Sequence, residues 1–302
     1  MPHDRSDIGT RGGHWAIFAI LRITYHPHHG IHAAQRPLVC RGLLNIRLLR
    51  PQTHPNPPAL PRPQPTDRIL DIGCGDGKFT ALFVPAIAHV LGVDSSPAMI
   101  AAANADHGSP KAEFRVLDCC FLDRDGNVTR GGWDKVISNA ALHWILRNEE
   151  TRISTLRGIH ASLKPDGVFV FEMGGHGNVA EVQSALIYAL VQRGVPLEEA
   201  RAINPWFFPS VNWMTAALEG IGFQVEKMEM EDRPTRLTEE ANGGLAGWVR
   251  LMGAPFLEVL PEGEREGVVR QVCEVLHTAV TRVEDGSQWL GYKRLRGIAR
   301  RV

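Results

Sequence analysis

The sequence has few of the features that mark metal, disulfide, nucleic-acid or membrane proteins. Only five of its 302 residues are cysteine, and none form a Cys-x-x-Cys pair, so neither a zinc site nor a disulfide framework is expected. Basic and acidic residues number 33 each, so bulk charge indicates no nucleic-acid or anionic-membrane partner. The apolar run from Trp15 to Ile23 is interrupted by Arg22 and is too short for a bilayer. We expect a cytoplasmic protein without a metal.

The first 66 residues differ in composition from the rest. They hold seven of the thirteen histidines, and eight arginines against two acidic residues. Seven prolines fall within residues 51–65, which favours an extended linker. We predict that residues 1–66 form a basic, disordered extension. The alternative for such a leader is a mitochondrial transit peptide, although serine is not enriched here.

From Asp67 onward, short apolar runs alternate with helical stretches, which is typical of a parallel sheet covered on both faces. We therefore predict one α/β domain with a doubly wound, Rossmann-like, mostly parallel sheet over residues 67–302. The strands are expected at residues 68–72, 90–94, 113–117, 133–139, 168–173, 223–231 and 292–301. A helical substrate cap is expected around residues 179–283, with helices at 179–193, 210–220, 244–260 and 262–283.

A glycine-rich turn, Asp71-Ile-Gly73-Cys74-Gly75-Asp-Gly77, stands between the first predicted strand and a helix. Glycines permit positive φ angles and let a ligand approach the backbone. Open α/β sheets bind ligands at the carboxyl ends of their strands. The turn alone leaves two interpretations open, a nucleotide-like ligand or a tight turn without one.

Acidic residues at the next strand ends favour a ligand. Asp94, followed by Ser95, comes 23 residues after Asp71 and can accept both hydroxyls of a ribose. Asp118 follows the third strand and can accept a hydrogen bond from an adenine amino group. Met99 can pack against the adenine face, although an ordinary core methionine is an equal alternative.

The spacing of the glycines separates two ligand classes. A dinucleotide pyrophosphate requires Gly-x-Gly-x-x-Gly at a helix N-terminus. Here the spacing is Gly-x-Gly-x-Gly, and the carboxylate of Asp71 would repel a pyrophosphate. A ligand with an ammonium group and a sulfonium suits the acid. The pattern therefore favours S-adenosylmethionine over a nicotinamide dinucleotide.

Four segments, 69–77, 91–97, 134–144 and 163–168, resemble successive motifs of the class I S-adenosylmethionine-dependent methyltransferases. The segment Asn139-Ala-Ala-Leu-His-Trp144 is similar to the trans-aconitate methyltransferase-like branch. The resemblance covers residues 66–302 and implies a seven-stranded sheet whose last strand is antiparallel. It also implies that Asp71 and the glycine turn lie near the methionine part, and that Asp118 with Cys119 lies at the adenine. Asn139 would line the donor cleft.

The N-terminus departs from that pattern. Members of the family usually begin with helices that close over the donor, whereas residues 1–66 are basic and rich in proline and histidine. If nothing covers the site, water exclusion and donor affinity suffer. A non-catalytic protein of this fold, with an assembly or regulatory role and an impaired donor site, is therefore the alternative to a small-molecule methyltransferase.

Transfer from a sulfonium needs a general base only where the acceptor is protonated, so a hydroxyl acceptor needs one and a carboxylate does not. His143, after the fourth strand, is the first candidate base, and His176 is the second. Arg233 or Arg250 can hold an acceptor carboxylate. Aromatic side chains are expected to form the acceptor site, unless they are the core between cap and sheet; they are Trp144, Trp206, Phe207, Phe208, Trp213 and Trp248.

Overall fold

The computed structural model describes residues 63–238 and 243–302. Of residues 1–66, which were predicted to form a disordered extension, residues 1–62 lie outside the described part. No helix within the described ranges is long and apolar enough to cross a membrane.

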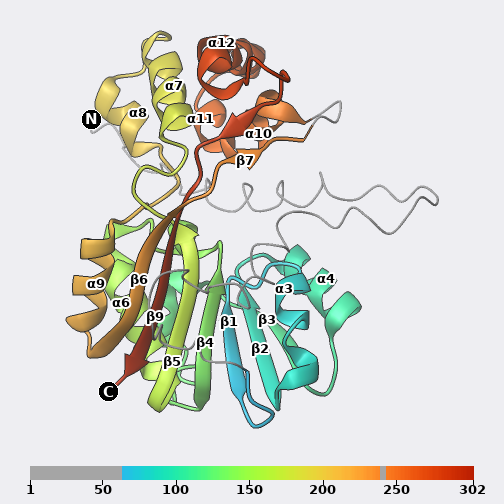
Figure 1. The fold of residues 1–302 in the computed structure, drawn as a ribbon, viewed down its shortest axis with the longest axis vertical. Helices are drawn as coiled ribbons and strands as arrows, with labels where there is room; N and C mark the ends of the chain where they lie inside the picture. The colour runs from blue at the N-terminus through green and yellow to red at the C-terminus, as the bar shows by residue number, and fades with distance from the viewer. Residues whose placement is uncertain (1–62, 239–242) are drawn as a thin grey trace, which may run out of the picture.

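Seven strands form the main sheet in the order β3-β2-β1-β4-β5-β9-β6, as Figure 1 shows. Strands β1 to β5 pair in parallel, and β9 is antiparallel to both β5 and β6. The predicted doubly wound, mostly parallel sheet with an antiparallel last strand is thus confirmed. The strands are β1 Arg68–Ile72, β2 His89–Asp94, β3 Ala112–Val116, β4 Trp133–Asn139, β5 Leu163–Gly174, β6 Phe223–Asp232 and β9 Lys293–Arg301.

Helices cover the two faces of this sheet through separate apolar clusters. Side-chain caps stabilise the first turns of two of these helices. The hydroxyl of Ser96 accepts from the Met99 N–H at the start of α4, and the hydroxyl of Ser210 caps α9 in the same way. Figure 1 shows α6 and α9 at the β6 end of the sheet and α3 and α4 at the β3 end. The helices are α3 Lys78–Ala81, α4 Pro97–His107, α6 Glu149–Ser162 and α9 Val211–Glu219.

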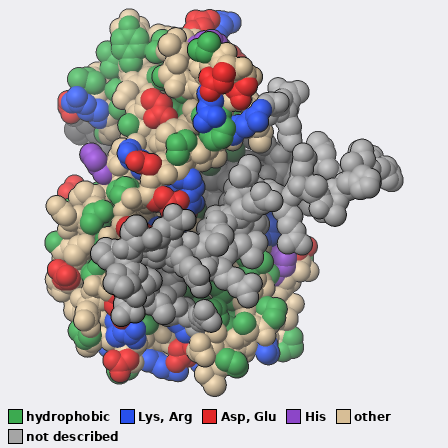
Figure 2. Space-filling view, viewed as in Figure 1, with side chains coloured by type: hydrophobic (Ala, Val, Ile, Leu, Met, Phe, Trp, Pro, Cys, Tyr) green, Lys and Arg blue, Asp and Glu red, His purple; other side chains and the backbone are tan. Residues whose placement is uncertain are grey.

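A helical cap with its own apolar core stands at the carboxyl ends of the parallel strands (Figure 1). Its core includes Leu186, Phe256 and Val272, all fully buried. In the space-filling view, acidic and basic side chains gather where the cap meets the sheet (Figure 2). The cap comprises α7 Ala180–Val191, α8 Leu197–Ala202, α10 Gly244–Met252, α11 Ala254–Glu258, α12 Glu262–Val280 and the pair β7 Thr235–Arg236 with β8 Trp289–Leu290.

Three local features differ from the sequence-based prediction. The helix expected over residues 244–260 is broken at Gly253; the next helix begins at Ala254 and has Pro255 in its first turn. The fifth strand, predicted to begin at residue 168, begins at Leu163, so that residues 164–167 lie within it, with Asp166 at a φ of 62°. The short helix α5, Leu142–Ile145, follows β4 and was not expected.

Candidate functional site

The glycine turn after β1 has two glycines that packing requires and one that faces open space. All three have left-handed φ angles, 72° at Gly73, 56° at Gly75 and 76° at Gly77. A Cβ at Gly73 would lie 2.2 Å from the Cβ of Ala141, and one at Gly77 would lie 2.8 Å from the ring of Phe114. A Cβ at Gly75 would meet nothing within 4 Å. The turn therefore exposes backbone at Gly75, where a ligand can approach.

Asp94, at the end of β2, connects this turn to α4. One carboxylate oxygen accepts from the Gly75 N–H at 3.1 Å, and the other accepts from the Ser96 N–H at 2.9 Å. Burial raises the pKa of this carboxyl, and the two backbone hydrogen bonds act against that rise. Since each oxygen keeps a second lone pair, the side chain can still accept bonds from a ligand hydroxyl.

Asp71, in β1, is a buried acid with one unsatisfied oxygen. Its Oδ2 accepts from the hydroxyl of Thr80 at 2.6 Å, whereas Oδ1 is buried without a hydrogen-bond partner among the described residues. Burial raises its pKa to about 7; the Thr80 bond works against this and the charge of Asp94 adds to it. The unpaired Oδ1 of Asp71 is therefore able to accept a hydrogen bond from a ligand or to bind a ligand cation.

Asn139, at the end of the adjacent strand β4, is also able to accept a hydrogen bond from a ligand. Its Oδ1 is buried and has no partner within the described residues. The two strand ends are fixed to each other by a bond from the Ser138 hydroxyl to the Ile72 carbonyl at 2.8 Å. Together, the unpaired oxygens of Asp71 and Asn139 and the open backbone at Gly75 fit a ligand with an ammonium group and hydroxyls, as S-adenosylmethionine has.

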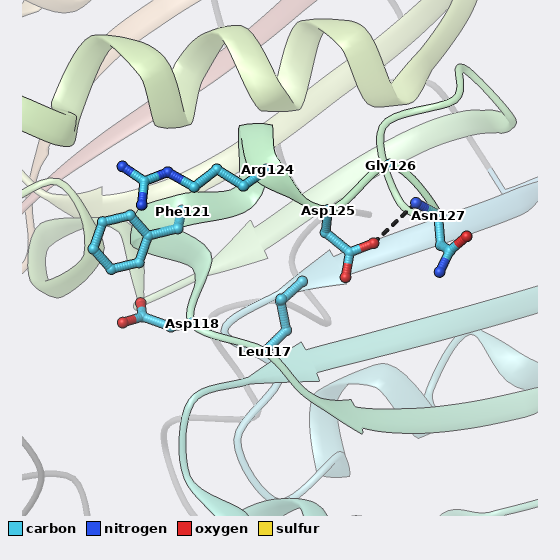
Figure 3. Close-up of a pocket in the computed structure, with 7 residues that line it drawn as sticks. All are labelled: Leu117, Asp118, Phe121, Arg124, Asp125, Gly126 and Asn127. Carbon is cyan, nitrogen blue, oxygen red and sulfur yellow. Dashed lines mark hydrogen bonds between the residues drawn. The ribbon is translucent and has the colours of Figure 1, made fainter.

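The predicted adenine residues lie around the next strand end. Asp118 is exposed and accepts from the Cys120 N–H at 2.9 Å, which caps a short 3-10 turn. It lines a shallow pocket of about 450 Å³ together with Phe121, and Figure 3 shows the two side by side. Met99 and Cys119 are buried, and Ser95 is half-buried.

Two of the predicted donor-site residues are thiols without nucleophilic character. Burial raises the pKa of Cys74, and the charges of Asp71 and Asp94 raise it further. Cys119 is likewise held protonated, first by burial and then by the charge of Asp94. A protonated thiol is a poor nucleophile, so both residues contribute shape rather than chemistry here.

His143 occupies a buried position in the short helix after β4. Its Nδ1 accepts from the backbone N–H of Gly174 at 3.3 Å. Burial, and then the positive charge of Arg294, lower its pKa well below the ordinary value. The ring is therefore neutral, and because Nδ1 accepts, its single proton is on Nε2. In this state His143 is a hydrogen-bond donor at Nε2 and not a free base.

Gly174 has no room for a side chain, which gives a prediction for this corner. A Cβ there would lie 2.4 Å from the ring of Phe208 and 3.0 Å from the amide nitrogen of Asn178. We expect Gly174→Ala to push Phe208 aside, to lengthen the bond to His143 and to cost about 1–3 kcal/mol of stability. Thermal unfolding measures the loss, and Gly263→Ala, with nothing within 4 Å, is the control. A Gly174→Ala protein as stable as wild type would contradict this packing.

The predicted acceptor-site aromatics divide into two groups. Trp206 lies against Trp144 with ring centres 5.6 Å apart, against Phe208 at 5.8 Å and against Trp248 at 6.1 Å. Trp213 packs elsewhere: its ring centre lies 4.8 Å from that of Phe207, and both rings pack against the apolar core of the sheet. The structure therefore brings four of the rings together beside His143 and leaves Trp213 apart from them.

The remaining predicted side chains have other surroundings. His176 is exposed in the turn after β5. Arg250 is on the surface, with a bidentate ion pair to Glu266 at 2.8 Å. Arg233 makes a bidentate pair with the buried Glu172 at 3.0 and 3.1 Å.

Sequence reasoning missed the residues around Glu172. Arg294 and Arg296 also donate to this carboxylate, from β9, at 3.1 and 2.9 Å. Tyr292, just before β9, accepts from the indole N–H of Trp248 at 2.7 Å. The available signal for Glu172 was its charge, because it lies inside a predicted strand whose other residues are apolar. No signal in the sequence pointed to its partners Arg294 and Arg296, because they come from a distant segment.

Comparisons with known proteins agree with this geometry. A family model described as a methyltransferase domain matches residues 70–169. An uncharacterized methyltransferase of Schizosaccharomyces pombe is 33% identical over 234 residues, 78% of this chain and 86% of that protein. A trans-aconitate 2-methyltransferase of Methylobacterium radiotolerans is 27% identical over 246 residues, 77% and 86% of the two chains. A juvenile hormone acid O-methyltransferase of Bombyx mori is 32% identical over 127 residues, 40% and 42%.

Proposed function

The chain belongs to the S-adenosylmethionine-dependent methyltransferases, and we propose that it transfers the methyl group to a carboxylate oxygen of a small molecule. The printed activities of two relatives support this choice, because trans-aconitate and juvenile hormone acid are both carboxylic acids.

The state of His143 is the observation that carries the proposal. A hydroxyl acceptor would need a base, and His143, the buried histidine among the described residues near the strand ends, has its Nδ1 occupied by the Gly174 N–H. Exposed His176 has no such fixed position. A carboxylate is ionised at neutral pH and is already nucleophilic, so it needs an orienting donor and no base. His143, protonated on Nε2, is suited to that task.

The donor site follows from the acids and glycines. S-adenosylmethionine supplies a methyl group already activated on its sulfonium. We propose that Asp71 and Asn139 hold its ammonium end, since each offers a buried unpaired oxygen. Asp94 would hold the ribose hydroxyls, with Gly75 beneath the ligand. Ser95 and Met99, which follow β2, and Asp118 and Cys119, which follow β3, would take the adenine.

Within the described residues, the geometry favours an enzyme over a non-catalytic protein of the same fold. The glycine turn is intact, and the acids at the ends of β1 and β2 are held in place by hydrogen bonds. Both unpaired oxygens remain available. Whether a segment closes over the donor concerns residues that lie outside the described part.

The product distinguishes a carboxylate acceptor from other acceptors. The protein is incubated with donor labelled in the methyl group and with a panel of small acids, each paired with its primary amide. We expect label transfer to acids and not to amides. The product should release labelled methanol in mild alkali, because methyl esters hydrolyse there and methyl ethers and amines do not. Alkali-stable product would contradict a carboxylate acceptor.

A further inference from the structure

We propose that His143, Tyr292 and Arg294 bind the carboxylate of the acceptor, and that this acceptor is an acid with an apolar body. The inference rests on the proposed function and names the substrate class and the residues that select it. None of the three was singled out as a carboxylate ligand by the sequence. They come from the short helix α5 after β4, from the segment before β9 and from β9 itself.

The backbone brings His143 and Arg294 to the same place. Arg294 is the ladder partner of Gly174 where β5 and β9 pair in antiparallel register. The Gly174 N–H in turn donates to Nδ1 of His143. Gly174 therefore positions both the ring of His143 and the backbone of Arg294, at the carboxyl end of β5 where the cap begins (Figure 1).

Each of the three side chains has donor capacity that nothing in the described part of the chain uses. Arg294 donates to Glu172 through Nε, and its terminal nitrogens have no partner among the described residues. Nε2 of His143 also has none there, yet it is not sealed from solvent. The Tyr292 hydroxyl accepts from Trp248, which leaves its own proton free to donate.

The positive charge of Arg294 acts on both of the other side chains, in keeping with the register of β5 and β9. It lowers the pKa of His143, after the larger effect of burial. It also lowers the pKa of Tyr292, against the rise that burial causes. In the ion-paired cluster, the two acids Glu172 and Glu231 face the three arginines Arg233, Arg294 and Arg296. A further carboxylate, Glu181, accepts from the Gly291 N–H and raises the pKa of Tyr292. The terminal nitrogens of Arg294, which have no hydrogen-bond partner among the described residues, therefore supply the positive end for a single carboxylate.

The residues around His143 and Arg294 favour an acceptor with an apolar body over an acceptor with several carboxylates. Arg233 and Arg296 are both engaged by Glu172 and Glu231, so neither has the free guanidinium end that Arg294 has. The ring of His143 lies 5.8 Å from Trp144 and 5.6 Å from Phe208. Trp248, bonded to Tyr292, continues this half-buried aromatic surface. A tricarboxylate would need further cations here, whereas an alkyl or terpenoid body would pack on the rings.

Kinetics with matched probes test the proposal. Decanoic acid, decanamide and trans-aconitate are compared as acceptors for the full chain. We expect decanoic acid to be methylated with a higher kcat/KM than trans-aconitate, and decanamide not to be methylated. For decanoic acid, Arg294→Gln should raise KM at least tenfold, because a charged hydrogen bond is lost. The Kd for S-adenosylhomocysteine should be unchanged.

Four further variants separate carboxylate binding from loss of structure. Arg296→Gln removes an equivalent contact to Glu172 and should change KM less than threefold. Tyr292→Phe keeps the ring and should raise KM severalfold. His143→Leu has no donor and should raise KM as Arg294→Gln does, whereas His143→Gln keeps an N–H donor and should raise KM less than His143→Leu. Equal effects of Arg294→Gln and Arg296→Gln would overturn the carboxylate site.

Direct binding distinguishes failure of this inference from failure of the proposed function. Decanoate is titrated by calorimetry into the protein saturated with S-adenosylhomocysteine. Binding that Arg294→Gln weakens tenfold, without turnover of any acid, would leave the carboxylate site standing and overturn carboxylate methylation. Turnover of trans-aconitate in preference to decanoate would overturn the apolar body. No binding of decanoate would overturn the site itself.

Discussion

Replacement of Asp71 with asparagine is expected to stabilise the protein without donor above pH 7 and to weaken donor binding at least tenfold. The wild-type carboxyl is buried and has a pKa of about 7, against an ordinary value of 3.8. Ionisation in that place costs about 4 kcal/mol, since each pKa unit corresponds to about 1.4 kcal/mol. Asparagine avoids this cost but leaves an unpaired amide at about 1–3 kcal/mol. We expect a net gain of about 1–3 kcal/mol at pH 8.

The sign of the pH dependence follows from the raised pKa of Asp71. Between about pH 4 and pH 7 the folded carboxyl holds a proton that the unfolded chain has released. The contribution of Asp71 to stability therefore falls as pH rises through this window. Denaturant unfolding from pH 4 to pH 8 should show this fall in wild type and a smaller one in Asp71→Asn. Parallel profiles for the two proteins would contradict the raised pKa.

The affinity for the donor should change with pH in the opposite direction to stability, which links the cost of ionising Asp71 to function. The ionised carboxylate attracts the ammonium group, so the affinity for S-adenosylhomocysteine should rise toward pH 7 in wild type and stay low in Asp71→Asn. Asp76→Asn is the control, because Asp76 lies in the same turn but pairs with Lys78 at 2.5 Å near the surface. Wild-type affinity in Asp71→Asn would remove this residue from the donor site.

The sheet was predictable because its strands are short apolar runs bounded by turn residues. The bounds predicted for β1 and β4 agree with the structure residue for residue, and the helix predicted over residues 210–220 is present as α9, directly after its cap Ser210. The cap was harder to predict. Gly253 is followed by Ala254 and Pro255, and this break divides a stretch whose apolar spacing is continuous. Short elements such as α8 and the β7-β8 pair have too few residues to show a period.

That the candidate donor residues lie close together could be predicted from the sequence, and the surroundings of His143 could not, for a physical reason. Acids and glycines at strand ends meet because parallel strands end at one edge of a sheet. The role of His143, in contrast, depends on Gly174, 31 residues away, and on Arg294, which reaches it through the antiparallel pairing of β9. The spacing of residues along the chain does not indicate that strand register. Trp213 was grouped with the other rings by residue type, whereas helix α9 carries it to the sheet core.

The exchange of Gly75 for alanine is expected to abolish most donor binding at little cost in stability. The left-handed φ of 56° makes a side chain strained there, at about 1–2 kcal/mol. Part of that strain is offset by the smaller entropy of the unfolded alanine chain. The new Cβ meets no protein atom within 4 Å, so it would occupy the space that faces the ligand. We expect at least a tenfold rise in the Kd for S-adenosylhomocysteine by calorimetry.

Two matched variants make the effect of Gly75→Ala specific. Gly286→Ala imposes a similar strain, at a φ of 69° with nothing within 4 Å, in a loop of the cap. It should lose about as much stability and bind the ligand as wild type does. Gly73→Ala places its Cβ 2.2 Å from that of Ala141, so it should be destabilised by several kcal/mol. If Gly75→Ala bound the ligand like Gly286→Ala, the backbone at Gly75 would not lie against the donor. The unpaired oxygens of Asp71 and Asn139 would then need another partner.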